Sequence, residues 1–291
     1  MRSAIGAWLI ERRIARVALI ATLLPLFGVI SAAIVVCVAI QKGWRESLLD
    51  CLIALVLVLG LTVMVGDGVA QVLFSSVSTW GIALLMGGLT GLYGSLILTI
   101  QAIIVLGCLA LIGFAALVGN PAEFWGPILQ IIIEQMQALN VELTVVNAIM
   151  ELVPYMSGLL IAGTLASSIV ALLLGCWWVG NVGGVSTREQ FLDLRLGYVV
   201  GGIAAVAGIG SLLGMQPLAA NLLLVASFGF LFQGIAVLHW HVAKRKLPWY
   251  LLIPVYLPAM MGPGFLIILF FLFAMVGFID NWFSLRRATA I

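Results

Sequence analysis

Charged residues are scarce in this chain of 291 residues. Only 8% of the positions carry Asp, Glu, Lys or Arg, whereas 64% are hydrophobic. An ordinary soluble domain has about 25% charged residues, which help to cover its apolar core. The apolar segments of this chain must therefore face lipid or one another, which predicts an all-α, polytopic transmembrane helical bundle. The formal net charge is only +2, so we expect no nucleic-acid partner.

Cysteine motifs are absent as well. The chain contains four cysteines and no Cys-x-x-Cys sequence. Each cysteine lies inside an apolar run, which is typical of a small buried hydrophobic residue rather than of a disulfide or a metal ligand. We therefore expect no metal site and no cofactor. The four residues are Cys37, Cys51, Cys108 and Cys176.

Enzyme signatures are also missing. The chain has no nucleophile elbow, zinc-protease motif or Walker A motif. Asp67 and Asp280 lie in apolar surroundings, as aspartates do in intramembrane aspartyl proteases, but neither has the flanking sequence of that class. We expect no catalytic residues and a protein that is not an enzyme.

Several apolar runs are long enough to cross a membrane without interruption. A transmembrane helix needs about 20 predominantly apolar residues. The uninterrupted runs are residues 48–65, 69–86, 96–118, 155–178, 197–213 and 218–240. The sequence GGLTGLYGS at 87–95 predicts a glycine-rich turn after the second of them.

Two further apolar stretches are expected to turn back on themselves. Pro25 and Gly28 interrupt residues 17–40, which favours a hairpin of two short helices. Residues 249–282 would exceed about 50 Å as a single helix. Two prolines and a Gly-Pro-Gly sequence divide this stretch into a tight hairpin with a short first limb. The chain then has about eight spans plus the N-terminal short-helix hairpin.

The start of the chain also resembles a signal peptide, because basic residues precede an apolar stretch. That stretch is long for a signal peptide, lacks a clear cleavage site and is followed by many more spans. We expect an uncleaved first membrane segment.

Residues 120–154 differ from the rest because they contain no Lys or Arg. They include four glutamates, and polar and apolar positions interleave at helical spacing, as in ILQIIIEQMQAL. This pattern predicts one or two amphipathic helices that lie on the membrane or cap the bundle. We place this amphipathic segment outside the cytoplasm, within a single transmembrane domain that covers residues 1–291.

Basic residues predict the orientation, because short cytoplasmic loops are enriched in Lys and Arg. They occur in the N-terminal segment, in three loops and in the C-terminal tail. The groups are Arg12, Arg13 and Arg16; Lys42 and Arg45; Arg188 and Arg195; Lys244, Arg245 and Lys246; and Arg286 and Arg287. Both termini are therefore expected in the cytoplasm.

Asp67 is the first candidate for ligand binding, since polar groups at membrane depth are costly. In the sequence VGDGVAQVLFSS, a helix places Asp67, Gln71 and Ser78 on one face. Such a face is suited to lining a polar cavity or to binding a cation or proton. The alternative is that Asp67 only caps the helix after an outer turn.

Gln233 is the second candidate, because it lies within an apolar span. Its amide both donates and accepts hydrogen bonds, so it either contacts a ligand or joins two helices. The same alternatives hold for Asn221. Asp280 and Arg287 are seven residues apart and share a helix face, which predicts a structural ion pair at the inner boundary. His239 and His241 point apart on a helix, so we expect interfacial histidines rather than metal ligands.

Small residues four positions apart allow helices to approach closely. Gly87 with Gly91, and Gly197 with Gly201, have this spacing. They predict helix contacts but do not indicate a particular function.

Several motifs, in order along most of the chain, resemble one family. They are KGWRE at 42–46, WW at 177–178, FLDLRLG at 191–197, FLFQGIAVLH at 230–239 and GFIDNW at 277–282 with nearby arginines. Together they resemble the YybS-like family of uncharacterised bacterial inner-membrane proteins. The resemblance implies location in the bacterial inner membrane and a distant similarity to substrate-binding subunits of energy-coupling-factor vitamin transporters. Those subunits have about six helices, fewer than this chain.

The expected function is a solute-binding or transport component without its own ATPase. It would bind a small molecule in a cavity lined by some of Asp67, Gln71 and Gln233, because transporters place their sites on interrupted, Gly- and Pro-rich helices. The alternative is a noncatalytic membrane scaffold or assembly partner. The expected partners are the lipid bilayer and either a small-molecule ligand or a membrane protein.

Overall fold

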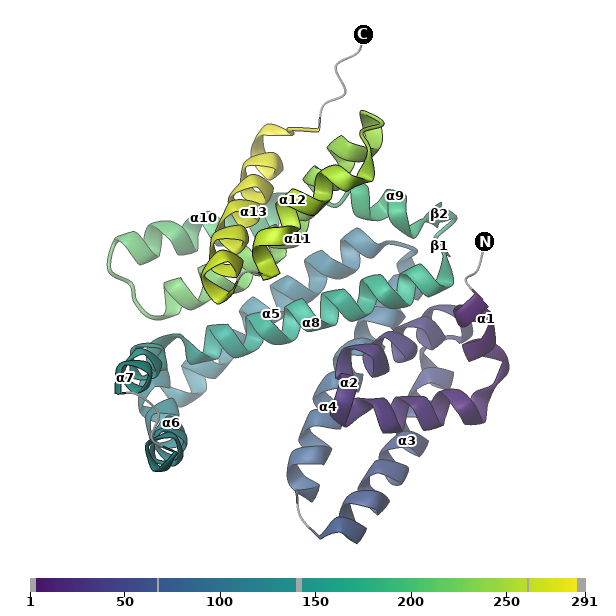
Figure 1. Ribbon diagram of the computed structural model, residues 1–291, viewed down its shortest axis with the longest axis horizontal. Coiled ribbons are helices and arrows are strands. Elements are labelled where there is room, and N and C mark those ends of the chain that lie inside the picture. The colour runs from purple at the N-terminus through teal and green to yellow at the C-terminus, as the bar shows by residue number, and fades with distance from the viewer. Residues whose placement is uncertain (1–3, 67, 140–142, 261, 287–291) are drawn as a thin grey trace. The chain divides into compact units, whose positions relative to one another are not determined.

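The computed structural model describes residues 4–66, 68–139, 143–260 and 262–286 (Figure 1). The fold is all-α, which confirms the predicted class. Within the described residues, eight helical segments are long and apolar enough to cross a membrane. One short β-hairpin interrupts the helices.

The α-helices are α1 (Ala4–Glu11), α2 (Arg13–Lys42), α3 (Trp44–Val65), α4 (Val69–Tyr93), α5 (Leu96–Val118), α6 (Pro121–Ala138), α7 (Leu143–Glu151), α8 (Met156–Val179), α9 (Thr187–Leu192), α10 (Gly197–Leu212), α11 (Leu218–Lys244), α12 (Ile253–Tyr256) and α13 (Pro263–Phe283). The hairpin strands are β1 (Asn181–Val182) and β2 (Val185–Ser186), and the 3₁₀ turns are η1 (Val153–Tyr155), η2 (Trp249–Leu252) and η3 (Leu257–Met260).

Local sequence explains where several helices begin and end. α3 ends at Gly66, whose φ of +103° suits glycine and whose N–H donates to the carbonyl of Thr62. α6 begins after Asn120, whose side chain accepts from the N–H of Ala122. Pro121 occupies the first turn of α6, where the missing N–H has no intrahelical partner to lose.

The chain divides into two compact units. The first comprises Met1–Ile103 and Ala166–Arg195, and the second comprises Ile104–Leu165 and Leu196–Ile291. Helices α5 and α8 each contribute residues to both units.

The N-terminal hairpin is present in the first unit, within α2. Phe27 leaves the helical conformation, with φ −139° and ψ 61°, two residues after Pro25. Ser31 Oγ donates to the carbonyl oxygen of Ile20 at 2.7 Å. In a straight helix these eleven residues would span about 16 Å, so the two limbs of α2 must fold back on each other. Figure 1 shows this turn in the purple ribbon.

The predicted glycine-rich turn at 87–95 is wrong over most of its length. Helix α4 continues to Tyr93, and Gly94, with φ +63°, ends it. Gly87 instead packs against α2, where an added Cβ would lie 2.7 Å from Cβ of Ala39. Gly91 also faces α2 closely. These glycines allow close helix packing, which confirms the expectation for the Gly87 and Gly91 pair.

Helices α11 and α13 form the tightest contact of the second unit. A Cβ at Gly234 would overlap the backbone of Phe273, and a Cβ at Gly277 would overlap the carbonyl of Phe230. The two backbones therefore touch directly, as small residues permit in membrane proteins. The Phe230 and Phe278 rings pack edge to face beside this contact.

The C-terminal apolar stretch has the predicted short first limb. Residues 249–260 form three single turns, η2, α12 and η3, and α13 follows after Gly262. The Tyr256 ring stacks on Phe273 of α13, with ring centroids 6.2 Å apart. The short limb therefore packs back on α13.

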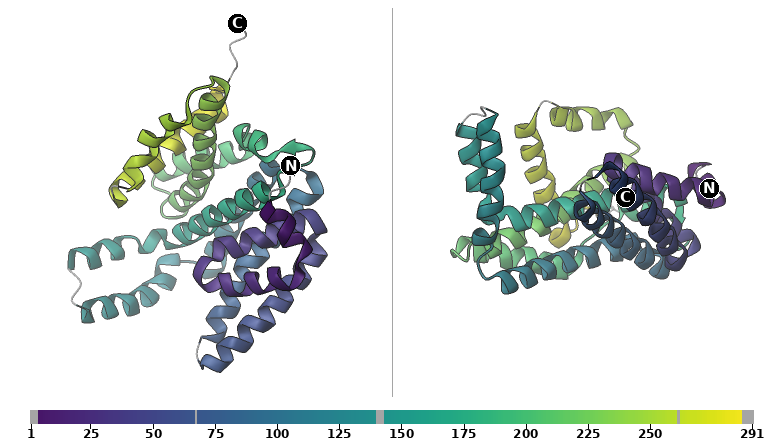
Figure 2. Two further views of the ribbon diagram at one scale, coloured as in Figure 1. Left: turned by 45° about the vertical axis from the view of Figure 1, so that its right-hand side comes forward. Right: turned by 90° about the horizontal axis from the view of Figure 1, so that it is seen from below.

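The amphipathic segment forms two helices, α6 and α7, which lie side by side in both views of Figure 2. Leu129 and Ile133 of α6 are buried, whereas Glu123 and Glu134 are exposed. Trp125 Nε1 donates to Ser157 Oγ at 2.8 Å, which joins α6 to the start of α8. The alternation predicted from the sequence is present.

Candidate functional site

Two residues of the polar face predicted on α4, Gln71 and Ser78, lie within the described ranges. Asp67 lies outside them. Gln71 is exposed. Ser78 Oγ donates to the carbonyls of Phe74 and Ser75 in its own helix, at 2.8 and 3.1 Å. The hydroxyl therefore satisfies itself locally, as serine commonly does inside apolar helices.

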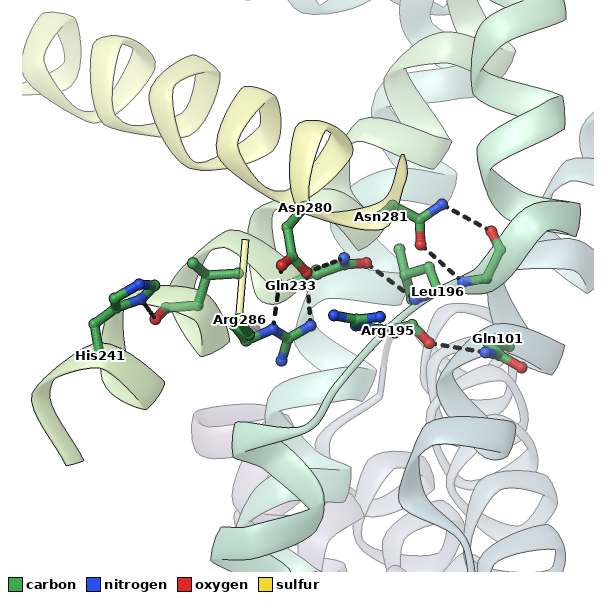
Figure 3. Close-up of polar contacts among 10 residues, drawn as sticks. Gln101, Arg195, Leu196, Gln233, His241, Asp280, Asn281 and Arg286 are labelled. Atoms are coloured by element: carbon green, nitrogen blue, oxygen red, sulfur yellow. Dashed lines mark hydrogen bonds and ion pairs between the residues drawn. The ribbon is translucent and has the colours of Figure 1, made fainter. Parts of the chain in front are cut away.

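Gln233 is fully buried in the second unit and joins three segments (Figure 3). Its Oε1 accepts from the N–H of Leu196 at 2.9 Å, and its Nε2 donates to Asp280 Oδ2 at 2.8 Å. Both ends of the amide are thus occupied within the protein. Two roles were predicted for Gln233, contact with a ligand and the joining of two helices. This geometry matches the second role.

Asp280 is fully buried at the end of α13 and pairs with Arg286. Arg286 Nη2 lies 2.7 Å from Asp280 Oδ2, and Arg286 Nε donates to Oδ1 at 3.3 Å. The helix ends at Phe283, and Ser284 adopts a left-handed conformation, which turns the chain back toward Asp280. Arg287, the predicted partner, lies outside the described residues.

Asn281 extends this network to the start of α10. Its Oδ1 accepts from the N–H of Gly197 at 2.9 Å, and its Nδ2 donates to the Gly197 carbonyl at 3.0 Å. A Cβ at Gly201 would lie 2.6 Å from Nδ2 of Asn281. Gly201 therefore makes room for this asparagine, and Gly197 supplies the backbone groups that it bonds.

Asn221 has a similar joining role. Its Oδ1 accepts from the N–H of Gly158 at 2.8 Å, and its Nδ2 donates to the carbonyls of Pro154 and Pro217. The side chain is buried. It satisfies backbone groups near the ends of α8 and α11, and its amide is fully used.

The remaining predicted polar residues have local partners. His239 Nδ1 and His241 Nδ1 each contact the carbonyl four residues earlier in α11, at 2.9 Å. Both rings are partly exposed. Within the described ranges, no group of three His, Cys, Asp or Glu side chains is placed to hold a metal ion.

Asp50 forms a buried ion-pair cluster that the sequence analysis missed. Its Oδ1 lies 2.8 Å from Arg13 Nε, and its Oδ2 lies 2.6 Å from Arg16 Nε. Asp50 is fully buried and Arg16 is 2% exposed. The available signal was an acid inside an apolar run, together with arginines spaced three apart on one helix face. The arginines had been interpreted only as markers of orientation.

A polar pocket of about 470 Å³ lies at the ends of three helices in the first unit. Its walls come from the C-terminal turns of α2, α4 and α8 and from the β-hairpin. The lining residues are Ile40, Gln41, Thr90, Gly91, Val179, Asn181, Val182 and Gly183. The sequence carries no signal for this pocket, because its three parts are far apart along the chain.

Gln41 is the lining residue whose side-chain oxygen is buried without a hydrogen-bond partner among the described residues. Among the described residues, only Gln41 Oε1 and Arg16 Nη2 are buried side-chain polar atoms without a hydrogen-bond partner. Gln41 Nε2 contacts Cys37 Sγ at 3.8 Å, a weak interaction. A buried acceptor without a donor costs about 1–3 kcal/mol. Such a group is a reason to look for a ligand.

Gln190 holds the other wall of the pocket in place. Its Oε1 accepts from the N–H of Leu96 at 2.8 Å. Its Nε2 donates to the carbonyls of Gly94 and Val182. This buried side chain fixes the β-hairpin against the end of α4, where the Cα of Gly183 approaches Gly94. The pocket wall is therefore held by a satisfied network.

A second cavity, of about 540 Å³, lies in the second unit between α5, α10 and α11. Its lining is apolar, and small residues such as Gly202 and Ala207 hollow it out. Val206 and Leu109 at its edge are exposed, as expected for side chains that face lipid. It lacks the polar groups that orient a polar solute.

These features define a multi-pass membrane protein whose buried carboxylates are paired with arginines. No family model, no curated protein and no solved structure matches the chain.

Proposed function

We propose that this protein is a solute-binding or transport component of the bacterial inner membrane, without its own ATPase. The observation that carries the proposal is the polar pocket with the unsatisfied oxygen of Gln41. Pockets that bind small molecules usually have volumes of about 300–1,000 Å³ and a few convergent polar groups. The pocket at the ends of α2, α4 and α8 meets both criteria.

The proposed site differs from the one expected from the sequence. The Gln233 amide is hydrogen-bonded to Leu196 and Asp280, so it is better suited to a structural role than to ligand binding. Gln71 is exposed on α4, far along the helix from the pocket residues Thr90 and Gly91. Gln41 replaces both as the candidate binding residue.

The proposal includes membership of the YybS-like family and the orientation with both termini in the cytoplasm. In that orientation the loop after Lys42 and the loop 180–196 are both cytoplasmic. Gln41 and Asn181 then place the pocket at the cytoplasmic boundary, where a solute enters or leaves. The similarity to vitamin-transporter subunits is an argument from analogy and carries less weight than the pocket.

A solute screen with a matched pair of variants tests the proposal. The full-length protein in nanodiscs is screened by thermal unfolding against vitamins, amines, sugars and organic acids. A ligand that binds only the folded state raises the unfolding temperature. We expect Gln41→Leu to abolish the shift of any true ligand and Gln71→Leu to leave it unchanged. A screen in which no solute gives a shift sensitive to Gln41→Leu rejects the pocket as a binding site.

The alternative function is a noncatalytic scaffold. Helix α6 favours it, because Phe124, Ile128 and Ile131 are exposed on a helix that also carries exposed glutamates. Crosslinking in membranes followed by mass spectrometry distinguishes the two functions. A stoichiometric protein partner lost on Ile131→Asp, with no solute effect in the screen, supports the scaffold.

A further inference from the structure

An apolar groove of about 330 Å³ lies between α3 and α4, two neighbouring helices of the first unit (Figure 1). Trp44 and Leu48, from the first two turns of α3, form one wall, and four leucines and Gly88 of α4 form the other. Gly88 helps to open the space, because an added Cβ there would meet only Cβ of Trp44, at 3.6 Å. Leu85 and Leu92 are exposed, so the groove opens toward the lipid that surrounds membrane-spanning helices.

Two basic residues flank the end of this groove at which α3 begins. Lys42 is the last residue of α2, and Arg45 is the second residue of α3. Both side chains are exposed. The guanidinium carbon of Arg45 lies 5.5 Å from the centroid of the Trp44 ring, within the range of a cation–π contact. Because Trp44 lines the groove, this contact holds a positive charge at its rim.

Carboxylates do not neutralise these two cations. Within the described ranges, no Asp or Glu oxygen lies within 4.0 Å of a side-chain nitrogen of Lys42 or Arg45. The groove lining contains no acidic residue. Glu46 and Asp50 follow Trp44 by two and six residues, which places them about 200° and 240° around α3 from it. Both acids lie instead beside Arg16.

The ends of the helices do not set the sign of the potential at the rim. At Gly43 the C-terminus of α2 meets the N-terminus of α3, and Gly94 follows the C-terminus of α4 just before α5 begins. Each helix end has the effect of about half a charge, positive at the N-terminus and negative at the C-terminus. These opposite partial charges offset each other at both turns. The basic side chains therefore decide the potential, which favours a negatively charged ligand.

We propose that this groove binds one anionic phospholipid. Its acyl chain lies in the groove against Leu48, Leu85 and Leu89, and its phosphate accepts hydrogen bonds from Lys42 and Arg45. Basic sites between membrane helices bind anionic headgroups, and tryptophan lies at the level of the headgroups. A soluble anion would leave the apolar groove empty, and a neutral lipid would leave the two cations unused. The inference goes beyond the proposed solute-binding function and does not depend on it.

The test compares two lipids and one soluble anion. Phosphatidylglycerol, phosphatidylcholine with the same acyl chains, and glycerol 3-phosphate are each added to the full-length protein in detergent micelles. Native mass spectrometry counts the molecules bound at each concentration. We expect the first phosphatidylglycerol to bind about tenfold more tightly than the first phosphatidylcholine, because only the former has a net negative charge. Glycerol 3-phosphate should neither bind nor displace the lipid.

Charge variants locate the headgroup. The double variant Lys42→Gln with Arg45→Gln is expected to lower the affinity for the first phosphatidylglycerol about tenfold. The double variant Lys244→Gln with Arg245→Gln is the matched control. It removes the same two charges from exposed positions at the end of α11, and it should leave the affinity unchanged.

A second pair of variants locates the acyl chain. Leu85→Trp fills the groove and is expected to weaken the first phosphatidylglycerol several-fold. Val63→Trp adds the same ring at an exposed position of α3 that is not part of the lining, and should bind as the unmodified protein does. Thermal unfolding confirms that each variant is folded, and Leu85→Trp keeps the test valid if the double variant of Lys42 and Arg45 does not fold.

The outcomes separate this site from other ways of binding lipid. Equal affinities for the two lipids, or equal effects of the two double variants, overturn the proposal. Binding of glycerol 3-phosphate that depends on Lys42 and Arg45 assigns the site to a soluble anion and also overturns it. Equal binding by Leu85→Trp and Val63→Trp shows that no chain occupies the groove. None of these results bears on the solute screen with Gln41→Leu, so the two proposals stand or fall separately.

Discussion

Arg286 Nη2 lies 2.7 Å from Asp280 Oδ2, and both side chains are buried at the end of α13. The same oxygen of Asp280 accepts from Gln233 Nε2, whose amide oxygen accepts from the backbone of Leu196. One ion pair thus ties the C-terminal turn to α11 and to the segment that precedes α10. This network joins three segments of the second unit.

Breaking this pair should be strongly destabilising. Arg286→Ala leaves the Asp280 carboxylate buried without its cation, which typically costs about 3–5 kcal/mol. Thermal unfolding of the purified protein in detergent measures the effect. Arg287→Ala is the matched comparison, because the seven-residue spacing predicted Arg287 as the partner. Equal losses for the two variants would contradict the observed pairing. The double variant Asp280→Asn with Arg286→Met removes both charges and should recover most of the loss.

Asp50 should be essential for the N-terminal hairpin. Asp50→Leu leaves Arg16, which is 2% exposed, with only the more distant carboxylate of Glu46, and we expect a loss of about 3–5 kcal/mol. Glu46→Gln is the control, because Glu46 Oε1 is 3.9 Å from Arg16 Nη2 and contributes little. Limited proteolysis of the N-terminal segment, alongside thermal unfolding, detects the opening of the hairpin. The assignment fails if Asp50→Leu and Glu46→Gln are cleaved at the same rate.

The contact between α11 and α13 should not tolerate a methyl group. Gly277→Ala places a Cβ against the carbonyl of Phe230, so the helices must move apart, at a cost of about 1–3 kcal/mol. Gly81→Ala is the control, since nothing lies within 4 Å of its added Cβ. Alanine is favoured over glycine in a helix, so this control should be neutral or slightly stabilising. Differential scanning fluorimetry of the two variants compares them, and equal unfolding temperatures would contradict the packing.

Reporter fusions test the proposed orientation. A fusion after residue 140 should report a location outside the cytoplasm, because residues 120–154 contain no Lys or Arg. Fusions after Lys246 and at the C-terminus should report the cytoplasm. Alkaline phosphatase and green fluorescent protein give opposite signals on the two sides. A cytoplasmic signal at residue 140 would reverse the predicted placement of every loop.

The helices could be predicted because their causes are local. Length and hydropathy place most of the apolar helices, and Pro25 predicts the break that folds α2 back at Phe27. The glycine-rich stretch 87–95 was misread because glycine both ends helices and lets them pack closely. Only the neighbour, here Ala39 against Gly87, decides which of the two applies.

The polar residues could be selected from the sequence, but their partners could not. Gln233 and Asp280 stood out as polar groups in apolar surroundings, and the structure joins them across 47 residues. Asp50 and Arg13 pair across 37 residues. A carboxylate buried in a low-dielectric interior requires a partner, but sequence alone does not say which arginine the fold brings near.

Composition and hydropathy were sufficient to establish a helical membrane protein, since a chain with so few charges must satisfy its backbone within helices when lipid surrounds it. The location of the proposed pocket depends on the tertiary structure alone. The pocket exists because the ends of α2, α4 and α8, which are distant in sequence, are brought together. The oxygen of Gln41, one of its lining residues, finds no donor among the described residues. Helix formation depends on neighbours along the chain, whereas a cavity and an unsatisfied acceptor depend on neighbours in space.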